Sequence, residues 1–298
     1  MSINEAHKKL LFQLYELYNN REAANISDLI IENITGFSKI DRIINKQFLL
    51  NTAQEKLLEN YTQQLLQQKP VQYILHEAWF AGMKFYVDEN VLIPRPETEE
   101  LVDWIEQEIG NKRNQKFQLT INNNQLTILD VGTGNGCIAI ALKKKLNADV
   151  CAIDISDKAL IVAEGNAKNL QSKVQFKQIN ILNKNDWKKL ALFDVIVSNP
   201  PYVKKSEQIT MQKNVINYEP HEALFVNDED ALIFYKTIAE FGLQHLNKNG
   251  KLFFEINEVF GKNVCLLLKK LGYKNIELKK DLNGKDRMVK AGCELMNL

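Results

Sequence analysis

The sequence lacks the usual marks of a metal, membrane or nucleic-acid-coating protein. Its four cysteines form no CxxC pair and its four histidines show no HExxH spacing, so no metal site is expected and a reduced cytoplasmic setting is the simplest inference. No run approaches about 18 consecutive apolar residues, and the first residues lack a signal-like apolar core, so no membrane association is predicted. The formal net charge is only +1, which argues against a stable nucleic-acid partner.

Proline and glycine are scarce at the N-terminal end. Residues 3–69 contain no proline and one glycine, Gly36, and their apolar residues recur at helical spacing. This pattern predicts a small helical domain over residues 1–75, with helix N-caps at residues 27–28 and 51–52. A bundle that only stabilises the protein and one that recognises a substrate both fit these observations.

A linker of different composition follows the predicted bundle. Pro70 closes the bundle, and residues 79–87 are rich in aromatic and β-branched residues around a glycine, which is typical of a strand. We expect a β-hairpin linker over residues 76–95, with its turn at 88–90 and its returning strand at 91–93.

The remainder, residues 96–298, is predicted to form a second domain that begins with a helix. Residues 110–125 are polar and aperiodic, which indicates a loop or a frayed insertion. Strand-like and helical segments then alternate, with strands at 126–131, 149–154, 174–179, 194–198 and 251–256, helices at 137–146, 157–170, 230–246 and 261–271, and a final strand pair within 275–291. The alternation predicts an α/β fold with a mostly parallel sheet, whose ligands bind at the carboxyl ends of the strands.

A glycine-rich turn joins the first of these strands to its helix. The turn consists of Gly132, Thr133, Gly134, Asn135 and Gly136. Glycines at alternate positions let the backbone turn sharply and let a ligand approach where no Cβ intervenes. Asp154 ends the second strand about 20 residues further on, where an acid holds a ribose diol, although it can also cap the next helix. Together these features predict a nucleotide-like cofactor.

A polar loop rich in proline follows the strand at 194–198. It consists of Asn199, Pro200, Pro201 and Tyr202. Because two consecutive prolines carry no N–H, the loop offers carbonyl oxygens and the Asn199 amide, and Tyr202 adds a flat apolar face. The loop is therefore suited to a planar group bearing an NH₂, either a base amine or a carboxamide. The alternative is an ordinary turn that ends the strand.

These features converge on methyl transfer from S-adenosylmethionine. That cofactor combines an adenosine with a methyl group on a sulfonium, and an oriented nucleophile accepts the methyl without a metal. We expect the Asn199 side-chain oxygen and the Pro200 carbonyl each to accept one N–H of the substrate, so that the nitrogen is fixed with its lone pair free. The clamp residues Asn199, Pro200, Pro201 and Tyr202 are the candidate catalytic residues.

The chain resembles the release factor glutamine methyltransferases, the HemK/PrmC family, over nearly its whole length. The matching segments are 70–74, 93–99, 130–136, 199–202, 218–220 and 281–287. The resemblance implies a class I, Rossmann-like, seven-stranded methyltransferase domain behind a helical N-terminal domain and a hairpin. It also implies a substrate: the glutamine side-chain amide in the Gly-Gly-Gln motif of class 1 peptide chain release factors.

The resemblance also implies roles for individual residues. Residues 132–136 would line the methionine and ribose portion of the cofactor, Asp154 would hold the ribose hydroxyls, and Asn199 would contact both cofactor and substrate. Ile181 would lie next to the adenine, where the family usually has an aromatic residue after an aspartate and this chain has Asn180-Ile181. The chain also departs from the family at Asn257 and Phe260, in place of glycine and glutamine, and at His76, where glycine is common.

Three other functions remain open on the sequence. An adenine N6-methyltransferase of DNA or RNA would use the same Asn-Pro-Pro-Tyr loop, but the balanced charge disfavours it. A ribosomal-protein glutamine methyltransferase is disfavoured by the linker, since the resemblance implies Pro-Arg-Ser-Pro there and residues 94–99 read Pro-Arg-Pro-Glu-Thr-Glu. A cofactor-binding protein without catalysis is disfavoured by the intact loop.

Overall fold

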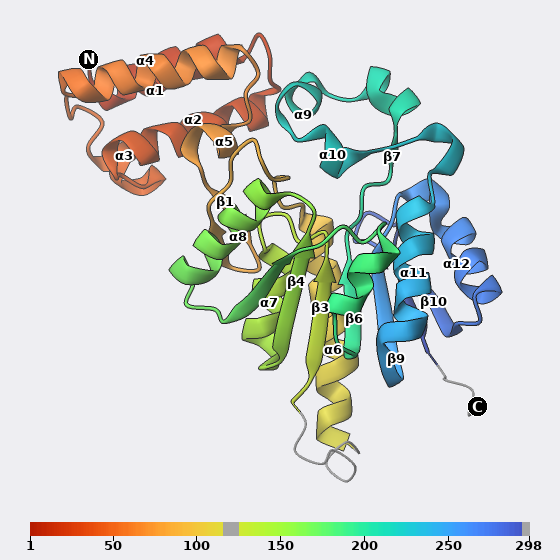
Figure 1. Ribbon diagram of the computed structural model, residues 1–298. Helices are drawn as coiled ribbons and strands as arrows, with labels where there is room; N and C mark the ends of the chain where they lie inside the picture. The colour runs from red at the N-terminus through yellow and green to blue at the C-terminus, as the bar shows by residue number, and fades with distance from the viewer. Residues whose placement is uncertain (116–124, 294–298) are drawn as a thin grey trace. The chain divides into compact units, whose positions relative to one another are not determined.

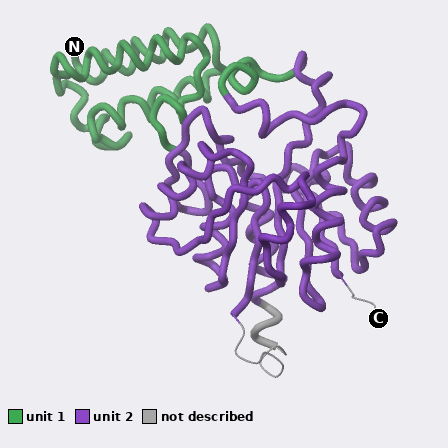
Figure 2. Tube along the Cα trace, viewed as in Figure 1, with its two compact units in different colours: residues 1–77, 211–218 green, residues 78–210, 219–298 purple. Residues whose placement is uncertain are grey.

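The computed structural model describes residues 1–115 and 125–293. These residues form two compact units, shown in Figure 2. Unit 1 comprises residues 1–77 and 211–218, and unit 2 comprises residues 78–210 and 219–298. Within the described part of the chain, no helix is both long and apolar enough to cross a bilayer.

Unit 1 is a helical bundle. Its helices are α1 (Ile3–Leu14), α2 (Asn20–Thr35), α3 (Lys39–Ile44), α4 (Thr52–Leu66), α5 (Val71–Leu75) and α9 (Lys213–Tyr218). Helices α1, α2, α4 and α5 bury their apolar faces against one another, as the helical spacing of the sequence predicts.

One of the two predicted N-caps of the bundle is confirmed. The side chain of Asn51 accepts a hydrogen bond from the backbone N–H of Gln54 at 3.0 Å and so caps α4. The N-cap predicted at residues 27–28 is wrong, because both residues lie inside α2, which Asn19 caps. Ser and Asp are typical of helix starts, but here the apolar residues on either side, Ile26 and Ile30, are buried in the bundle. Their packing keeps residues 27–28 within the helix.

A β-hairpin opens unit 2, but its turn differs from the predicted one. Strand β1 (Ala78–Phe80) pairs with β2 (Met83–Phe85) around a tight turn at residues 81–82. Tyr86 does not extend β2, because the side chain of Asn166 pairs with both its backbone groups, at 2.7 Å to the N–H and 3.0 Å to the carbonyl. A turn does occur at residues 89–90, but residues 91–93 form no strand.

Seven strands form the central sheet of unit 2 (Figure 1). They are β3 (Thr127–Val131), β4 (Asp149–Asp154), β5 (Val174–Gln178), β6 (Phe193–Ser198), β9 (Leu246–Glu255), β10 (Lys274–Lys280) and β11 (Asp286–Gly292). Their order is β10-β11-β9-β6-β3-β4-β5, and only β11 runs antiparallel to its neighbours. Each strand predicted for this sheet is present, although β9 begins at residue 246 rather than 251.

Helices cover both faces of this sheet (Figure 1). They are α6 (Pro96–Gln115), α7 (Cys137–Leu146), α8 (Asp157–Asn169), α11 (Ile233–His245) and α12 (Gly261–Lys270). Shorter elements are η2 (Lys184–Lys189), β7 (Val203–Lys204), η3 (Lys205–Thr210), α10 (His221–Leu224), β8 (Phe225–Val226), η4 (Asp228–Asp230) and η5 (Glu258–Phe260). The loop predicted at residues 110–125 is wrong in its first part, since α6 continues to 115; residues 116–124 lie outside the described residues.

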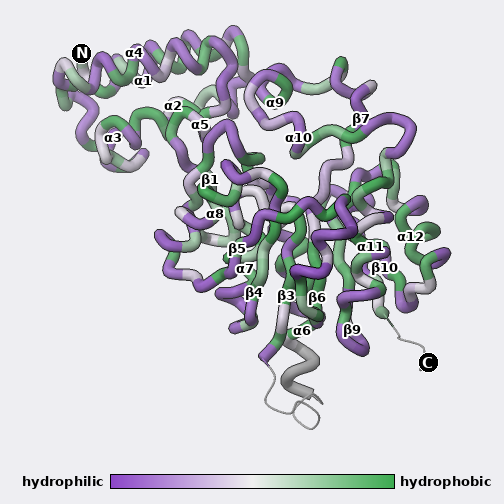
Figure 3. Tube along the Cα trace, in the orientation of Figure 1, coloured by the Kyte–Doolittle hydropathy of each residue, from purple (hydrophilic) through white to green (hydrophobic). Residues whose placement is uncertain are grey.

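The sheet divides the core of unit 2 into two apolar clusters. Helices α6 and α7, with the β1–β2 hairpin, pack on one face, and α11, α12 and η2 pack on the other. Figure 3 shows the central strands β4 and β6 as hydrophobic segments. Strands buried on both faces are continuous apolar runs, which is why the sequence locates them so well.

Strand order reverses between β3 and β6. The chain moves from β3 outward through β4 and β5, then returns to place β6 on the other side of β3. The hydroxyl of Ser198, at the end of β6, donates to the carbonyl of Val131 at the end of β3, at 2.7 Å. The loops that follow these two strands are therefore neighbours at the point where such sheets bind ligands.

Candidate active site

The Asn-Pro-Pro-Tyr loop begins directly after β6. Pro200 is buried, and Asn199, Pro201 and Tyr202 are half-buried. The Asn199 Nδ2 donates a hydrogen bond to Thr98 Oγ1 at 3.3 Å. The loop is therefore held by side chains as well as by its prolines.

Two residues that the sequence reasoning did not single out support this loop. Thr98 lies in the first turn of α6, and its hydroxyl donates to Glu255 Oε2 at 2.6 Å. The other carboxylate oxygen, Oε1, accepts from the Tyr202 hydroxyl at 3.2 Å. Glu255 ends β9 and is only 1% exposed. Its burial raises its pKa, while the Thr98 hydrogen bond, the Arg287 charge and the Tyr202 hydrogen bond oppose that rise.

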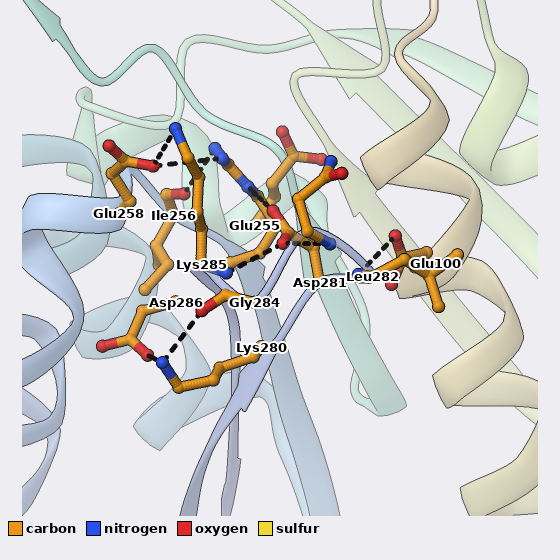
Figure 4. Close-up of polar contacts among 12 residues, drawn as sticks. Glu100, Glu255, Ile256, Glu258, Lys280, Asp281, Leu282, Gly284, Lys285 and Asp286 are labelled. Carbon is orange, nitrogen blue, oxygen red and sulfur yellow. Dashed lines mark hydrogen bonds and ion pairs between the residues drawn. The ribbon is translucent and has the colours of Figure 1, made fainter.

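A turn between β10 and β11 holds Arg287 beside Glu255. The Asp281 Oδ1 accepts from two backbone N–H groups within the turn, and its Oδ2 accepts from Arg287 Nε at 3.1 Å. Figure 4 shows Asp281 and Glu255 in the same cluster, with Glu100 of α6 accepting from the Leu282 backbone N–H. The segment 281–287, one of those that resemble the family, thus places a cation next to the buried carboxylate.

The glycine turn after β3 is open where a cofactor would approach. Gly132 and Gly134 have φ of +74° and +54°, and a Cβ on either would meet nothing within 4 Å. Gly136 differs, because a Cβ there would lie 3.2 Å from the Ala163 Cβ of α8. The first two glycines therefore leave open space, whereas the third allows a helix to pack closely.

Two carboxylates lie at this turn. Asp154 accepts from the backbone N–H of Gly134 and of Ser156, both at 2.9 Å, so it joins the glycine turn to the start of α8. Asp130 is fully buried; its Oδ2 accepts from the Thr133 hydroxyl at 2.6 Å, and its Oδ1 has no hydrogen-bond partner among the described residues. An unpartnered acceptor and an open backbone suit S-adenosylmethionine, which carries hydroxyl donors and positive charge.

Asn135 and Asn166 anchor the turn from behind. The Asn135 Oδ1 accepts from the backbone N–H of Cys137, the first residue of α7, at 3.0 Å, and the Asn135 backbone carbonyl accepts from Asn166 Nδ2 at 3.0 Å. Asn166 is 1% exposed and also fixes Tyr86. Sequence reasoning missed Asn166, because a single asparagine on α8 carries no motif that marks it as buried.

The candidate adenine neighbour and the three departures from the family have clear structural positions. Ile181 packs in the core cluster with Trp187, and its carbonyl accepts from Trp187 Nε1 at 2.8 Å. Asn257 caps η5 and Phe260 is buried. His76 ends α5 with φ of +53°, a left-handed conformation that glycine adopts without strain, which explains why glycine is common there.

Arg95, which lies between Pro94 and Pro96, has a partner within unit 2. Its Nη2 lies 2.6 Å from Glu219 Oε1, and the Glu219 side chain is 1% exposed. The segments 93–99 and 218–220, which are far apart in sequence, are therefore joined by an ion pair. Burial raises the pKa of Glu219, and Arg95 opposes that rise.

Comparisons with known proteins cover both parts of the chain. A family model described as PrmC N-terminal domain matches residues 6–75, and one described as methyltransferase domain matches residues 122–296. The release factor glutamine methyltransferase of Flavobacterium psychrophilum is 45% identical, over 98% of this chain and 99% of that protein. The protein of the same name from Bacteroides thetaiotaomicron is 39% identical, over 93% and 95%.

Solved structures share the fold at low identity. The catalytic domain of hMettl16 in complex with MAT2A 3′UTR hairpin 6 has a TM-score of 0.54 at 15% identity, and the match covers 83% of each chain. A methyltransferase from Pyrococcus furiosus has a TM-score of 0.50 at 18% identity, covering 80% of this chain and all of that one.

The sheet order, the glycine turn and the loop after β6 define an S-adenosylmethionine-dependent methyltransferase of the class I fold. The predicted fold class and cofactor are thereby confirmed. Within this class, the chain belongs to the release factor glutamine methyltransferases, as its near full-length relatives demonstrate. The predicted family is therefore confirmed as well.

Proposed function

We propose that this protein transfers a methyl group from S-adenosylmethionine to the side-chain amide nitrogen of the glutamine in the Gly-Gly-Gln motif of class 1 peptide chain release factors. The observation that carries the proposal is the Asn-Pro-Pro-Tyr loop, which lies at the reversal of strand order next to an open glycine turn. The near full-length identity to release factor glutamine methyltransferases supports this substrate.

The loop would act by orienting a poor nucleophile. An amide nitrogen has a delocalised lone pair, so Asn199 Oδ1 and the Pro200 carbonyl would each accept one of its N–H groups and leave the lone pair directed at the donor. When bound, S-adenosylmethionine supplies a methyl group on a positively charged sulfonium. Orientation of this kind contributes on the order of 7 kcal/mol, and the two dipoles stabilise the charge that develops on nitrogen. Tyr202 would pack on the planar amide and exclude water.

The glycine turn and its acids would hold the cofactor. Residues 132–136 would line the methionine and ribose portion, with open space beside the backbone at Gly132 and Gly134. Asp154 uses one acceptor position of each oxygen on backbone N–H groups, so its remaining lone pairs are available for ribose hydroxyls. Ile181 would contribute an apolar edge to the adenine site in place of an aromatic ring.

The domains would divide recognition from chemistry. We assign residues 1–75 to recognition of the release factor, 76–95 to a linker and 96–298 to methyl transfer. A release-factor substrate places the enzyme in the cytoplasm, where translation terminates. The near-neutral charge supports a protein substrate rather than stable binding to nucleic acid.

Incubation with purified release factor and S-adenosylmethionine tests the proposal. Peptide mass spectrometry should detect one added methyl group on the glutamine of the Gly-Gly-Gln peptide. Labelling of DNA or RNA alone would instead establish the adenine methyltransferase, and labelling of a ribosomal protein alone the other glutamine methyltransferase. Asn199→Ala should lower kcat on the order of 100-fold with cofactor affinity retained, and normal turnover would refute the role of Asn199.

A further inference from the structure

The amide of Asn199 can face its surroundings in two ways. A rotation of its side-chain amide exchanges Oδ1, which accepts hydrogen bonds, for Nδ2, which donates them. A substrate NH₂ group needs an acceptor. The neighbours that decide which atom faces the substrate are therefore as important as the presence of asparagine.

The Thr98 hydroxyl decides between these two orientations. It has one hydrogen, which it donates to Glu255 Oε2 at 2.6 Å. Towards Asn199 the Thr98 hydroxyl can then act only as an acceptor, so Nδ2 rather than Oδ1 must face it. The observed contact agrees, since Asn199 Nδ2 lies 3.3 Å from Thr98 Oγ1. The Asn199 Oδ1 is thereby the amide atom that does not face Thr98, and it remains available to accept from a substrate N–H.

Both carboxylate oxygens of Glu255 accept hydrogen bonds. Its Oε1 accepts from the Tyr202 hydroxyl and its Oε2 from the Thr98 hydroxyl; burial raises the pKa of this carboxyl, and the Arg287 charge and these two hydrogen bonds favour the ionised form. Asp281, which accepts from Arg287 Nε, lies in the same cluster as Glu255 (Figure 4). If Glu255 instead donated to Thr98, the Thr98 hydrogen would be free to donate to Asn199, which would turn Nδ2 towards the substrate. Two N–H donors would then face each other.

We propose that Thr98 and Glu255 are positioning residues, which fix the Asn199 amide so that its Oδ1 faces the substrate NH₂. This inference rests on the proposed function, because it concerns how the same loop presents an acceptor. It predicts that the Thr98 hydroxyl, rather than the methyl group or volume of that side chain, is what catalysis requires.

Thr98→Val tests this directly, with Thr98→Ser as the matched control. Valine keeps the shape and removes the hydroxyl, whereas serine keeps the hydroxyl. Under single-turnover conditions with labelled cofactor and release factor, Thr98→Val should slow transfer roughly 10- to 100-fold, and Thr98→Ser should recover most of the rate. Affinity for S-adenosylmethionine, measured by calorimetry, should change little in either variant. Equal impairment of both variants, or a wild-type rate in Thr98→Val, would overturn the inference.

A second measurement is independent of turnover. The side-chain NH₂ resonances of Asn199, assigned by their loss in Asn199→Ala, should be protected from solvent exchange in the wild type and in Thr98→Ser, and unprotected in Thr98→Val. Unchanged protection in Thr98→Val would contradict the assigned contact even if the rate fell. In the Asn199→Ala background, Thr98→Val should cause no further loss of rate, because Thr98 acts through Asn199.

The two proposals fail in different ways. If the wild-type protein binds S-adenosylmethionine but does not methylate the release factor, the proposed function is wrong, while the NMR comparison still tests the orientation of Asn199. If the wild type methylates the glutamine and Thr98→Val does so equally fast, only the positioning role is wrong.

Discussion

Asp130 should make the stability of the cofactor-free protein fall as pH rises towards neutrality. Its carboxyl is fully buried, and this burial raises its pKa to about 7, while the Thr133 hydrogen bond opposes the rise and the Asp154 charge adds to it. In the unfolded chain, the same carboxyl titrates near its ordinary value of 3.8. Between these two values the folded state binds a proton that the unfolded state does not, so stability decreases as pH increases.

The size of the effect follows from the two pKa values. Each pH unit between them is worth about 1.4 kcal/mol, so the contribution of Asp130 should decline by roughly 3 kcal/mol between pH 5 and pH 8. Asp130→Asn removes the titration with almost no change in volume. Carboxyl groups that do not interact with Asp130 contribute equally to both proteins and cancel in the difference.

Urea denaturation of both proteins at several pH values measures this difference. The stability of the wild type minus that of Asp130→Asn should fall steadily up to about pH 7 and then level off. Thr133→Val removes a hydrogen bond that favours the charged carboxylate, so the pH at which the curve levels off should rise. A difference that does not vary with pH would refute the reasoning, because it would mean that Asp130 titrates alike in both states.

Two further pairs of variants test the glycine turn and the ion pair between Arg95 and the buried Glu219. Gly132→Ala should lower stability by about 1–2 kcal/mol through its positive φ and should weaken cofactor binding, since the new Cβ enters open space. Gly136→Ala should cost more stability than Gly132→Ala, because its Cβ also meets the Ala163 Cβ at 3.2 Å. Urea denaturation measures the loss of stability and calorimetry measures the loss of cofactor affinity. Equal losses of stability in the two variants would contradict this explanation. Arg95→Ala should destabilise the protein by roughly 2 kcal/mol, because it leaves Glu219 buried without its partner. The same substitution should destabilise a Glu219→Gln variant much less. Additive losses of stability in this double-variant cycle would disprove an energetic coupling between the two side chains.

The sequence predicts the sheet of unit 2 well, because each central strand is a short apolar run set off by polar or glycine-rich segments. The predicted bounds of β4 and α7 coincide with the observed ones, and the final strand pair is present as β10 and β11. Errors occur where a side chain distant in sequence forms the hydrogen bonds of the local backbone. Tyr86 belongs to a strand by composition, but the Asn166 side chain, 80 residues away, satisfies its backbone groups instead.

In the candidate site as well, residues marked by local sequence can be predicted, whereas residues brought together from distant parts of the chain cannot. The six prolines of the chain all lie within the segments that resemble the family, and a proline-stiffened loop can be recognised without a partner. Thr98 and Glu255 cannot be recognised in this way, because they lie 157 residues apart and 101 residues separate Thr98 from Asn199.

Strand order supplies the missing connection between these residues. In the parallel pair formed by β6 and β9, Ser198 is opposite Phe254, so the next residues along the two strands, Asn199 and Glu255, leave the sheet side by side. Thr98, from the start of α6, bridges the two side chains, because its hydroxyl donates to Glu255 and accepts from Asn199. In a sheet of this order, a positioning residue for the loop after β6 is therefore expected directly after the last residue of β9 that pairs with β6. A residue at the start of a neighbouring helix, as Thr98 is in α6, can then connect it to the loop.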